Sequence, residues 1–281
     1  MKPYYSNGGI VLYLGDCREV SPLLTERGIV MFDAPYSEHV HSKSRAGSRK
    51  LKGGAKAGAE NSPANLSRVV DLGFSSLSAE LRQHLALESA RLASRWVLSF
   101  ADVESCHLWR ESFVAAKLNY CRTGIWRKIG ATPQFTGDRP AAAFETITIA
   151  HPKGRKRWNG GGKHGWWDAA PDAGDPSLIY EAPIVLERGR ANGEPRIHET
   201  RKPESLMVKL IEDFTDPDEL VIDFTAGGAT TLVCAKRLGR RGVGIEIREE
   251  AAEKAAKRID AEISGVGYHA AEAGQTGFAY S

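Results

Sequence analysis

The sequence predicts an α/β fold in which helices cover both faces of a doubly wound, mainly parallel sheet. Two short apolar runs, Ile10–Leu14 and Gly28–Phe32, each stop at an acidic turn, as buried strands do whose polar ends meet at one edge of a sheet. Residues 220–246 have the pattern of a strand, a glycine-bearing turn, a helix and a second strand. This alternation of strands and helices favours a parallel sheet.

The remaining elements follow from apolar periodicity and from capping residues. Ser78 precedes a helical pattern of leucines as its expected N-cap, and Pro203 fits the first turn of a later helix. The predicted strands are residues 10–14, 28–32, 96–100, 119–127, 144–151, 220–222 and 242–245. The predicted helices are residues 78–94, 102–118, 203–214, 230–238 and 248–263. Residues 152–196, rich in glycine, proline, tryptophan and charge, are expected to form an insertion rather than another strand and helix.

Composition indicates an ordinary globular protein. The chain has 281 residues, of which 42% are hydrophobic and 26% charged, enough for one large domain with insertions. No apolar run approaches a membrane span and the polar start is unlike a signal peptide, so the expected location is cytoplasmic, with no membrane partner. The four cysteines are far apart without a Cys-x-x-Cys pair, so we expect free thiols and no metal site.

Two basic segments predict contact with a polyanion, nucleic acid first. Residues 39–59 and residues 147–167 contain no acid, and tryptophans interleave with the basic residues of the second segment. The side chains expected to bind nucleic acid are Lys43, Arg45, Arg49, Lys50, Lys153, Arg155, Lys156 and Arg157. A solvated loop is the alternative for either segment alone. Because there are two segments, and one directly follows a candidate active turn, contact with DNA or RNA is favoured.

The first candidate site is the tetrapeptide Asp33-Ala34-Pro35-Tyr36, which follows a predicted strand. Open α/β sheets bind their ligands at the carboxyl ends of strands. Asp33 can accept hydrogen bonds from an amino group, a backbone carbonyl of the turn can accept another, and the Tyr36 ring can stack on a flat ring. An acid alone could cap a helix and a tyrosine alone could belong to the core. Together they fit a planar substrate that carries an amino group.

A second candidate site is the turn after residues 220–222. Gly227 and Gly228 allow the backbone to approach a ligand, and Glu246 ends the next strand, where a carboxylate can hold both hydroxyls of a ribose. The G-x-G-x-x-G fingerprint of pyrophosphate binding is absent, and Asp223 at the mouth of the turn repels phosphate and attracts a cation. This favours S-adenosylmethionine, whose sulfonium and ammonium groups are positive, over NAD. The alternative is a unit of this shape that binds nothing.

Three motifs in order resemble one family. They are the tetrapeptide Asp33-Ala34-Pro35-Tyr36, the segment 198–206, and the loop 223–231 with residues 239–240 and 244–246. In this order the chain resembles, from about residue 12 to residue 258, the β class of bacterial and phage site-specific DNA amino-methyltransferases. The resemblance implies a Rossmann-like methyltransferase sheet with circularly permuted motif order. It divides the chain into a catalytic part (residues 1–151), a target-recognition insertion (residues 152–197) and a cofactor-binding part (residues 198–281).

The resemblance also implies roles for single residues and a reaction. Asp33, Ala34, Pro35 and Tyr36 match the catalytic tetrapeptide, and residues 126–128 and 144–145 match paired strands beside the target pocket. The implied cofactor-binding residues are Asp16, Asp33, His198, Lys202, Pro203, Asp223, Thr225, Gly227, Thr230 and Glu246. The implied reaction moves a methyl group from S-adenosylmethionine to the exocyclic amino group of adenine (N6) in double-stranded DNA after base flipping. An aspartate rather than a serine in the tetrapeptide favours adenine over the N4 position of cytosine.

Two departures from the family pattern leave an alternative open. Ala34 stands where the family has a proline, and Gly228-Ala229 stands where Ser-Gly is usual. The Ala34 carbonyl is retained and Pro35 keeps the preceding residue extended, so the loss of one ring loosens the turn by only about 0.4–1 kcal/mol. The alternatives are therefore an N4-cytosine enzyme, or a DNA-binding protein whose methyl transfer is weakened or lost. A homodimer, a cognate restriction endonuclease and a nucleoid-associated location also accord with the resemblance.

Overall fold

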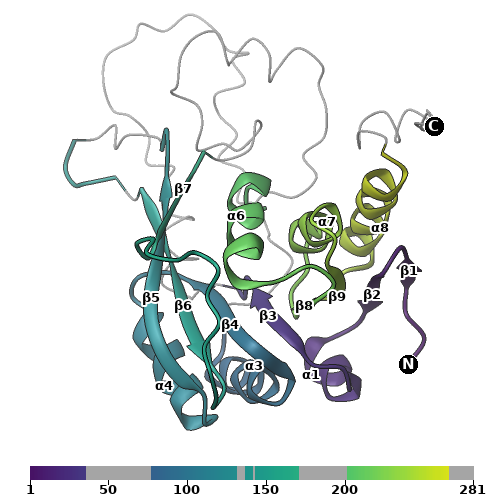
Figure 1. Ribbon diagram of the computed structural model, residues 1–281, viewed down its shortest axis with the longest axis horizontal. Coiled ribbons are helices and arrows are strands. Elements are labelled where there is room, and N and C mark those ends of the chain that lie inside the picture. The colour runs from purple at the N-terminus through teal and green to yellow at the C-terminus, as the bar shows by residue number, and fades with distance from the viewer. Residues whose placement is uncertain (36–76, 132–136, 142, 171–200, 266–281) are drawn as a thin grey trace, which may run out of the picture.

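One mixed nine-stranded sheet organises the described residues, in the order β1-β2-β9-β8-β3-β4-β6-β5-β7 (Figure 1). The computed structural model describes residues 1–35, 77–131, 137–141, 143–170 and 201–265. The strands are β1 (Tyr5–Asn7), β2 (Ile10–Leu14), β3 (Gly28–Phe32), β4 (Ala93–Ala101), β5 (Asn119–Lys128), β6 (Phe144–His151), β7 (Trp166–Ala169), β8 (Leu220–Asp223) and β9 (Arg241–Glu246). The helices are α1 (Cys17–Val20), the 3-10 turn η1 (Ser21–Leu23), α3 (Ala79–Leu92), α4 (Cys106–Ala115), α6 (Glu204–Phe214), α7 (Thr230–Arg237) and α8 (Glu249–Ser264).

The strand directions create one functional edge. β2, β9, β8, β3 and β4 run parallel to one another, so their carboxyl ends lie side by side at what we call the carboxyl edge. β6 runs antiparallel between β4 and β5, so it begins where its neighbours end. In Figure 1 the early strand β3 lies between the late strand β8 and the middle strand β4. Gly28 makes this packing possible, because a Cβ there would come within 2.3 Å of the Leu220 carbonyl oxygen.

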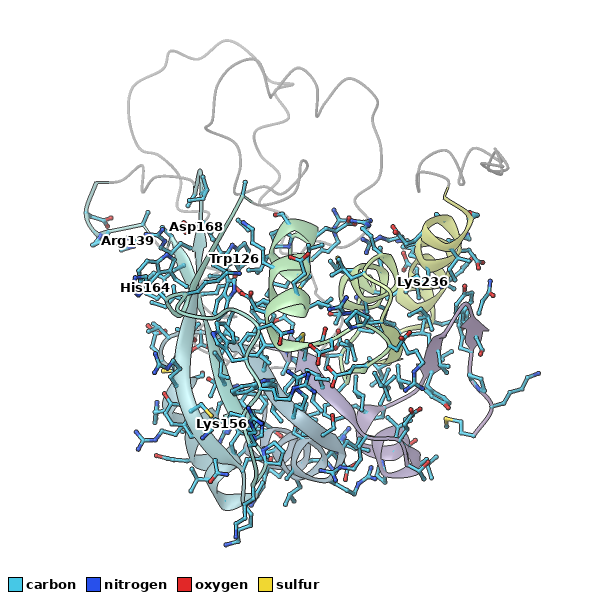
Figure 2. The ribbon with its side chains drawn as sticks, viewed as in Figure 1. Trp126, Arg139, Lys156, His164, Asp168 and Lys236 are labelled. Atoms are coloured by element: carbon cyan, nitrogen blue, oxygen red, sulfur yellow. The ribbon has the colours of Figure 1, made fainter. Side chains whose placement is uncertain are left out.

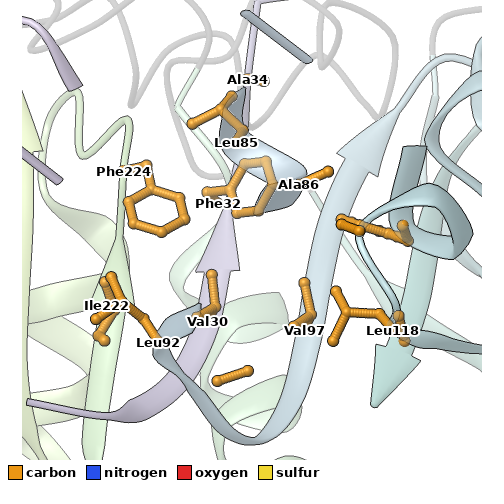
Figure 3. Close-up of a cluster of buried hydrophobic side chains, with 14 of the residues drawn as sticks. Val30, Phe32, Ala34, Leu85, Ala86, Leu92, Val97, Leu118, Ile222 and Phe224 are labelled. Carbon is orange, nitrogen blue, oxygen red and sulfur yellow. The ribbon is translucent and has the colours of Figure 1, made fainter. Parts of the chain in front are cut away.

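Alternating side chains of the central strands fill a core on each face of the sheet. On β3, Val30 and Phe32 pack with residues of α3 and α4, whereas Ile29 and Met31 pack with residues of α6. Ile10 and Leu12 of β2 pack with residues of α7 and α8. Figure 3 shows the first cluster, in which Ala34 lies beyond the end of β3 near Phe32. Ala34, the second residue of the candidate tetrapeptide, is thus fixed by the core.

All predicted strands and helices are confirmed, with differences at their ends. The helix predicted from residue 102 begins at Cys106, because Asp102 closes a turn in which Ser105 donates its amide and hydroxyl hydrogens to it. The described part of the predicted insertion, residues 152–170, contributes the short strand β7 beside β5. Trp158 and Trp167 pack against Phe214 of α6 and anchor this segment to the sheet. Among the described residues, no helix is long and apolar enough to cross a membrane.

Candidate active site

Four acidic side chains from four adjacent strands meet at the carboxyl edge. Glu246 ends β9, Asp223 ends β8, and Asp33 directly follows β3. Asp16 follows β2, whose Leu14 is in register with Glu246. The sequence predicted each of these acids at a strand end, and the parallel pairing is what brings them together.

The loop between β8 and α7 is tied to Glu246. The backbone N–H of Gly227 donates to Glu246 Oε2 and that of Arg248 donates to Oε1, both at 2.9 Å. Gly227 has a φ of 52°, a left-handed conformation that glycine adopts without strain. Each carboxylate oxygen keeps a further lone pair for a ligand. Glu246 thus holds the loop closed and can still accept hydrogen bonds from hydroxyl groups.

Asp223 is a buried acid at the centre of this edge, with 3% of its surface exposed. Burial raises its pKa to about 7, and the charges of Asp33 and Glu246 add to this, although the Thr231 hydroxyl and the Thr225 amide donate hydrogen bonds that oppose it. A cation placed here would relieve the repulsion and return the carboxyl group to its ionised form. The electrostatics therefore favour a positively charged ligand.

Asp33 is paired with a lysine that sequence reasoning assigned to the cofactor. Lys202 Nζ lies 2.5 Å from Asp33 Oδ2 and 3.2 Å from Glu145 Oε2. Glu145 in turn lies 2.8 Å from Lys128 Nζ through its other oxygen. The resemblance did associate residues 126–128 and 144–145 with the target pocket, and the predicted pairing of these strands is confirmed. It gave no indication that a salt bridge would join them to Asp33.

Two buried oxygens at this edge have no hydrogen-bond partner within the part of the chain that the structure describes. They are Oδ1 of Asp33 and the hydroxyl oxygen of Thr225. Buried polar atoms without a partner are uncommon and call for an explanation, such as a bound ligand. Both atoms belong to residues that the sequence predicted to contact cofactor or substrate.

The other predicted cofactor residues lie around the same loop, held by groups that the sequence did not suggest. Thr230 starts α7, and its hydroxyl lies 3.3 Å from Arg258, which also donates to the Gly228 carbonyl and pairs with Glu204 at 2.7 Å. Pro203 is buried and serves as N-cap of α6. The clue to Arg258 was its position on the apolar face of α8, among the buried residues Ala251, Ala255 and Ile259.

The Asp16 carboxylate is bound by Arg18 in this structure. Its carboxylate caps α1 by accepting the Arg18 amide at 2.8 Å and also binds the Arg18 guanidinium, and these contacts lower its pKa. Its place beside Glu246 fits the predicted cofactor role, which stays a prediction. Tyr36, His198 and the basic residues Lys43, Arg45, Arg49 and Lys50 lie outside the described residues.

The second basic segment lies away from the carboxyl edge. It follows the end of β6, where His151 pairs with Asn119 at the start of β5. The Arg157 carbonyl accepts hydrogen bonds from Arg95 and Trp96 near the start of β4, and its guanidinium pairs with Asp216. In Figure 2, Lys156 lies near one end of the β5–β6 pair and Asp168 near the other. The structure therefore does not bring Lys153, Arg155, Lys156 and Arg157 together with Asp33, and their contact with DNA stays a prediction.

Comparison with known families identifies the chain. The sequence model of the N6/N4 family, described as a DNA methylase, matches residues 106–257, more than half of the chain. The chain belongs to this family. Among curated relatives of this DNA methylase, the Type II methyltransferase M.HinfI of Haemophilus influenzae is 27% identical over 171 residues, 59% of this chain and 46% of that protein. The Type II methyltransferase M2.DpnII of Streptococcus pneumoniae is 43% identical over 65 residues, 23% of this chain and 24% of that protein. The chain thus spans less than half the length of these curated relatives.

Solved structures show the same fold. The M1.HpyAVI–SAM complex superposes with a TM-score of 0.61 at 17% identity, covering 89% of this chain and 99% of that one. PvuII DNA methyltransferase, described as cytosine-N4-specific, gives a TM-score of 0.62 at 14% identity, covering 100% of this chain and 98% of that one. At these identities the likeness concerns the fold, and it confirms the predicted Rossmann-like methyltransferase sheet.

Proposed function

We propose that this DNA methylase transfers a methyl group from S-adenosylmethionine to the exocyclic amino group of adenine (N6) in double-stranded DNA. The observation that carries the proposal is the position of Asp33. Its Oδ1 is buried and without a partner in the described residues, at the end of a strand adjacent to the one that ends at Asp223. A hydrogen-bond acceptor for an amino group therefore stands next to an acid that favours a cation.

The residues at the carboxyl edge fit S-adenosylmethionine, which supplies an electrophilic methyl group when bound. Asp223 and Thr225 would face its charged and polar groups, and Glu246 would accept hydrogen bonds from ribose hydroxyls. Gly227 gives the loop its left-handed turn next to Glu246. The solved complexes of M1.HpyAVI and of TTHA0409 from Thermus thermophilus with this cofactor support the assignment. Asp16, His198, Lys202, Pro203 and Thr230 complete the predicted cofactor set.

The tetrapeptide would hold the target base. A base inside a duplex has to leave the stack, at a cost of a few kcal/mol, and stacking on Tyr36 would offset about 1–3 kcal/mol of it. Asp33 Oδ1 and the Ala34 carbonyl would then accept hydrogen bonds from the amino group and orient its lone pair. Lys43, Arg45, Arg49 and Lys50 directly follow the tetrapeptide, so we propose that this segment contacts phosphates near the flipped base.

Cytosine N4 is the second candidate, because the fold is shared with a cytosine-N4-specific enzyme. Asp33 in the tetrapeptide supports adenine instead. The names of both curated relatives include the words Type II methyltransferase, which supports a cognate restriction endonuclease as a partner. The predicted homodimer, the location on the nucleoid and the recognition role of residues 152–197 remain part of the proposal.

The test is to map modified bases in DNA from cells that express the protein. Single-molecule sequencing would give the site, and a nucleoside digest analysed by mass spectrometry would distinguish N6-methyladenine from N4-methylcytosine. We expect N6-methyladenine at one sequence, and none in cells that express Asp33→Ala. N4-methylcytosine would favour the cytosine alternative. Cofactor and DNA binding without either product would favour a protein that has lost transfer, with Ala34 as the first position to change to proline.

A further inference from the structure

Asp33 is the end of a chain of four alternating charges. Asp33, Lys202, Glu145 and Lys128 are joined by successive contacts of 2.5, 3.2 and 2.8 Å. They come from four separate parts of the fold: the end of β3, the segment before α6, the start of β6 and the end of β5. Such an arrangement requires the tertiary structure, and it balances two acids with two bases.

Lys202 is held on several sides. Only 10% of its side chain is exposed, its ammonium lies between two carboxylates, and it also stands 5.0 Å from the centroid of the Phe100 ring. Pro203, the next residue, is buried at the start of α6. These constraints fix the ammonium beside Asp33.

The salt bridge with Lys202 makes the two carboxylate oxygens of Asp33 different. Oδ2 is bound to Lys202, whereas Oδ1 is buried without a partner among the described residues. An ionised carboxylate whose one oxygen is occupied offers the other as an acceptor of fixed direction. A neutral carboxylic acid in the same place would carry a proton and could present a donor instead.

We infer that Lys202 is a positioning residue for Asp33, holding the carboxylate ionised and aiming Oδ1 at the target amino group, rather than a ligand of the cofactor. Glu145, itself held by Lys128, fixes Lys202. This inference rests on the proposed function, because the amino group is that of the target base.

The charges around Asp33 predict in which direction its pKa should move when each neighbour is replaced. The described groups that act on it are Lys202 from the segment before α6, Glu145 from β6, Lys128 from β5 and Asp223 from β8. Burial raises the pKa of Asp33 and Glu145 adds to this, whereas Lys202 and Lys128 oppose it. Burial opposes the charged form of Lys202, but the two carboxylates raise its pKa overall, so it stays protonated. Removing Lys202 should therefore raise the pKa of Asp33, and removing the charge of Glu145 should lower it.

The test compares Lys202→Met, Lys202→Arg and Glu145→Gln with the control Lys209→Met, a lysine of α6 that contacts the Asp168 carbonyl. Single-turnover methyl transfer is followed from pH 5 to 9, and cofactor affinity is measured by calorimetry. For Lys202→Met we expect a rate about 100-fold lower at neutral pH, an acid limb shifted upward by about one pH unit, and cofactor affinity within about threefold of wild type. Lys202→Arg should restore most of the rate, Glu145→Gln should shift the acid limb downward, and the control should change neither.

Other outcomes would overturn the inference. A tenfold loss of cofactor affinity in Lys202→Met with an unchanged pH profile would return Lys202 to the cofactor, and an upward shift in Glu145→Gln would contradict the charge chain. If Lys202→Met does not fold, Glu145→Gln alone decides through the sign of its shift. If wild type transfers no methyl group, the proposed function fails, and a carbon-13 NMR titration of the Asp33 carboxyl, assigned with Asp33→Asn, still tests the pairing. An Asp33 pKa that is the same in wild type and in both variants would then refute it.

Discussion

The two sides of the carboxyl edge differ in how they hold their acids. On the side of β9 and β8, Glu246 and Asp223 accept hydrogen bonds from backbone amides, and Asp223 also accepts one from a hydroxyl. On the side of β3, β6 and β5, Asp33 and Glu145 are paired with Lys202 and Lys128. The lysines of the second side also lie over aromatic rings, Phe100 and Trp126.

Under the proposed function, this difference would let one site hold two different ligands. On the first side Arg248 Nε lies 3.6 Å from Glu246 Oε1, but Asp223 is held by amide and hydroxyl donors, which do not neutralise it. The field at Asp223 therefore stays negative and suits a sulfonium or an ammonium group. Salt bridges neutralise the second side and leave one acceptor oxygen, Asp33 Oδ1, without a partner among the described residues. Such an acceptor in neutral surroundings suits an uncharged amino group. Under the proposed function, the methyl donor and the methyl acceptor would thus be separated by charge, at the boundary between Asp223 and Asp33.

The largest effect is expected from removing the acceptor on the second side. Asp33→Ala should lower single-turnover methyl transfer by at least about 100-fold, because the amino group loses its oriented acceptor. Cofactor and DNA affinity should stay within a few-fold of wild type. Glu250→Ala, an exposed acid of α8 that pairs with Lys254, is the control and should keep its activity. Substantial transfer by Asp33→Ala would remove the catalytic assignment.

The next largest effect should come from Glu246 on the first side. Glu246→Ala removes the acceptor of the Gly227 amide and the proposed ribose ligand, so calorimetry should show S-adenosylmethionine affinity about 10- to 100-fold lower. Glu253→Ala, an exposed acid of α8, controls for the loss of one negative charge. Unchanged affinity in Glu246→Ala would place the cofactor elsewhere.

The negative field of the first side can be tested through pH. Because Asp223 has a raised pKa of about 7, it is largely neutral below that pH, and a cationic ligand must displace its proton. Affinity for S-adenosylmethionine should therefore rise about tenfold per unit between pH 5 and 7 and then level off, with release of close to one proton below pH 7. Calorimetry in buffers of different ionisation enthalpy measures that proton. If cofactor binding to Asp223→Asn releases the same number of protons, the proton comes from another group.

The smallest effect is expected at Ala229, the N-cap of α7, which has a φ of 59°. Ala229→Gly relieves the strain of a left-handed alanine, which stabilises the fold by about 1–2 kcal/mol. It also removes a buried methyl group and raises the entropy of the unfolded chain, and these two losses together cost a similar free energy. The free energy of unfolding should change by less than about 1 kcal/mol. Ala235→Gly, buried within α7, has no strain to relieve and should lose about 2 kcal/mol. Equal losses in denaturant titrations would show that Ala229 is not strained.

Much of the fold could be predicted because its central strands are short, fully apolar and followed by acids. Gly28–Phe32 is buried along its whole length, and the prediction of this strand needed no knowledge of its neighbours. The four-residue strand β7 was missed, since two tryptophans among glycines give no periodic signal and Trp167 is fixed by Phe214 of a distant helix. Local pattern predicts such elements only when burial is continuous along the chain.

The site was predicted in part for the same reason. Asp33, Asp223 and Glu246 stand at strand ends, so the parallel topology alone brings them together. The salt bridge from Lys202 could not be predicted, because it depends on β6 running antiparallel and delivering Glu145 to the same edge. Arg258 likewise acts from the far end of the chain on the Gly228 carbonyl. Contacts of this kind follow from tertiary packing rather than from spacing.

The interleaving of early and late strands has a consequence for biosynthesis. Ile29 of β3 pairs with Val221 of β8, and Leu14 of β2 pairs with Glu246 of β9, so the middle of the sheet is built from the two ends of the described chain. Until β8 and β9 have been translated, β2 lacks its parallel partner β9 and β3 lacks its parallel partner β8. The apolar side chains of β2 and β3 that pack against α6 and α7 are also uncovered until then. A nascent chain therefore acquires neither Asp223 beside Asp33 nor the Glu246 loop until β8 and β9 have emerged. The candidate site can therefore form only after β9 has been translated.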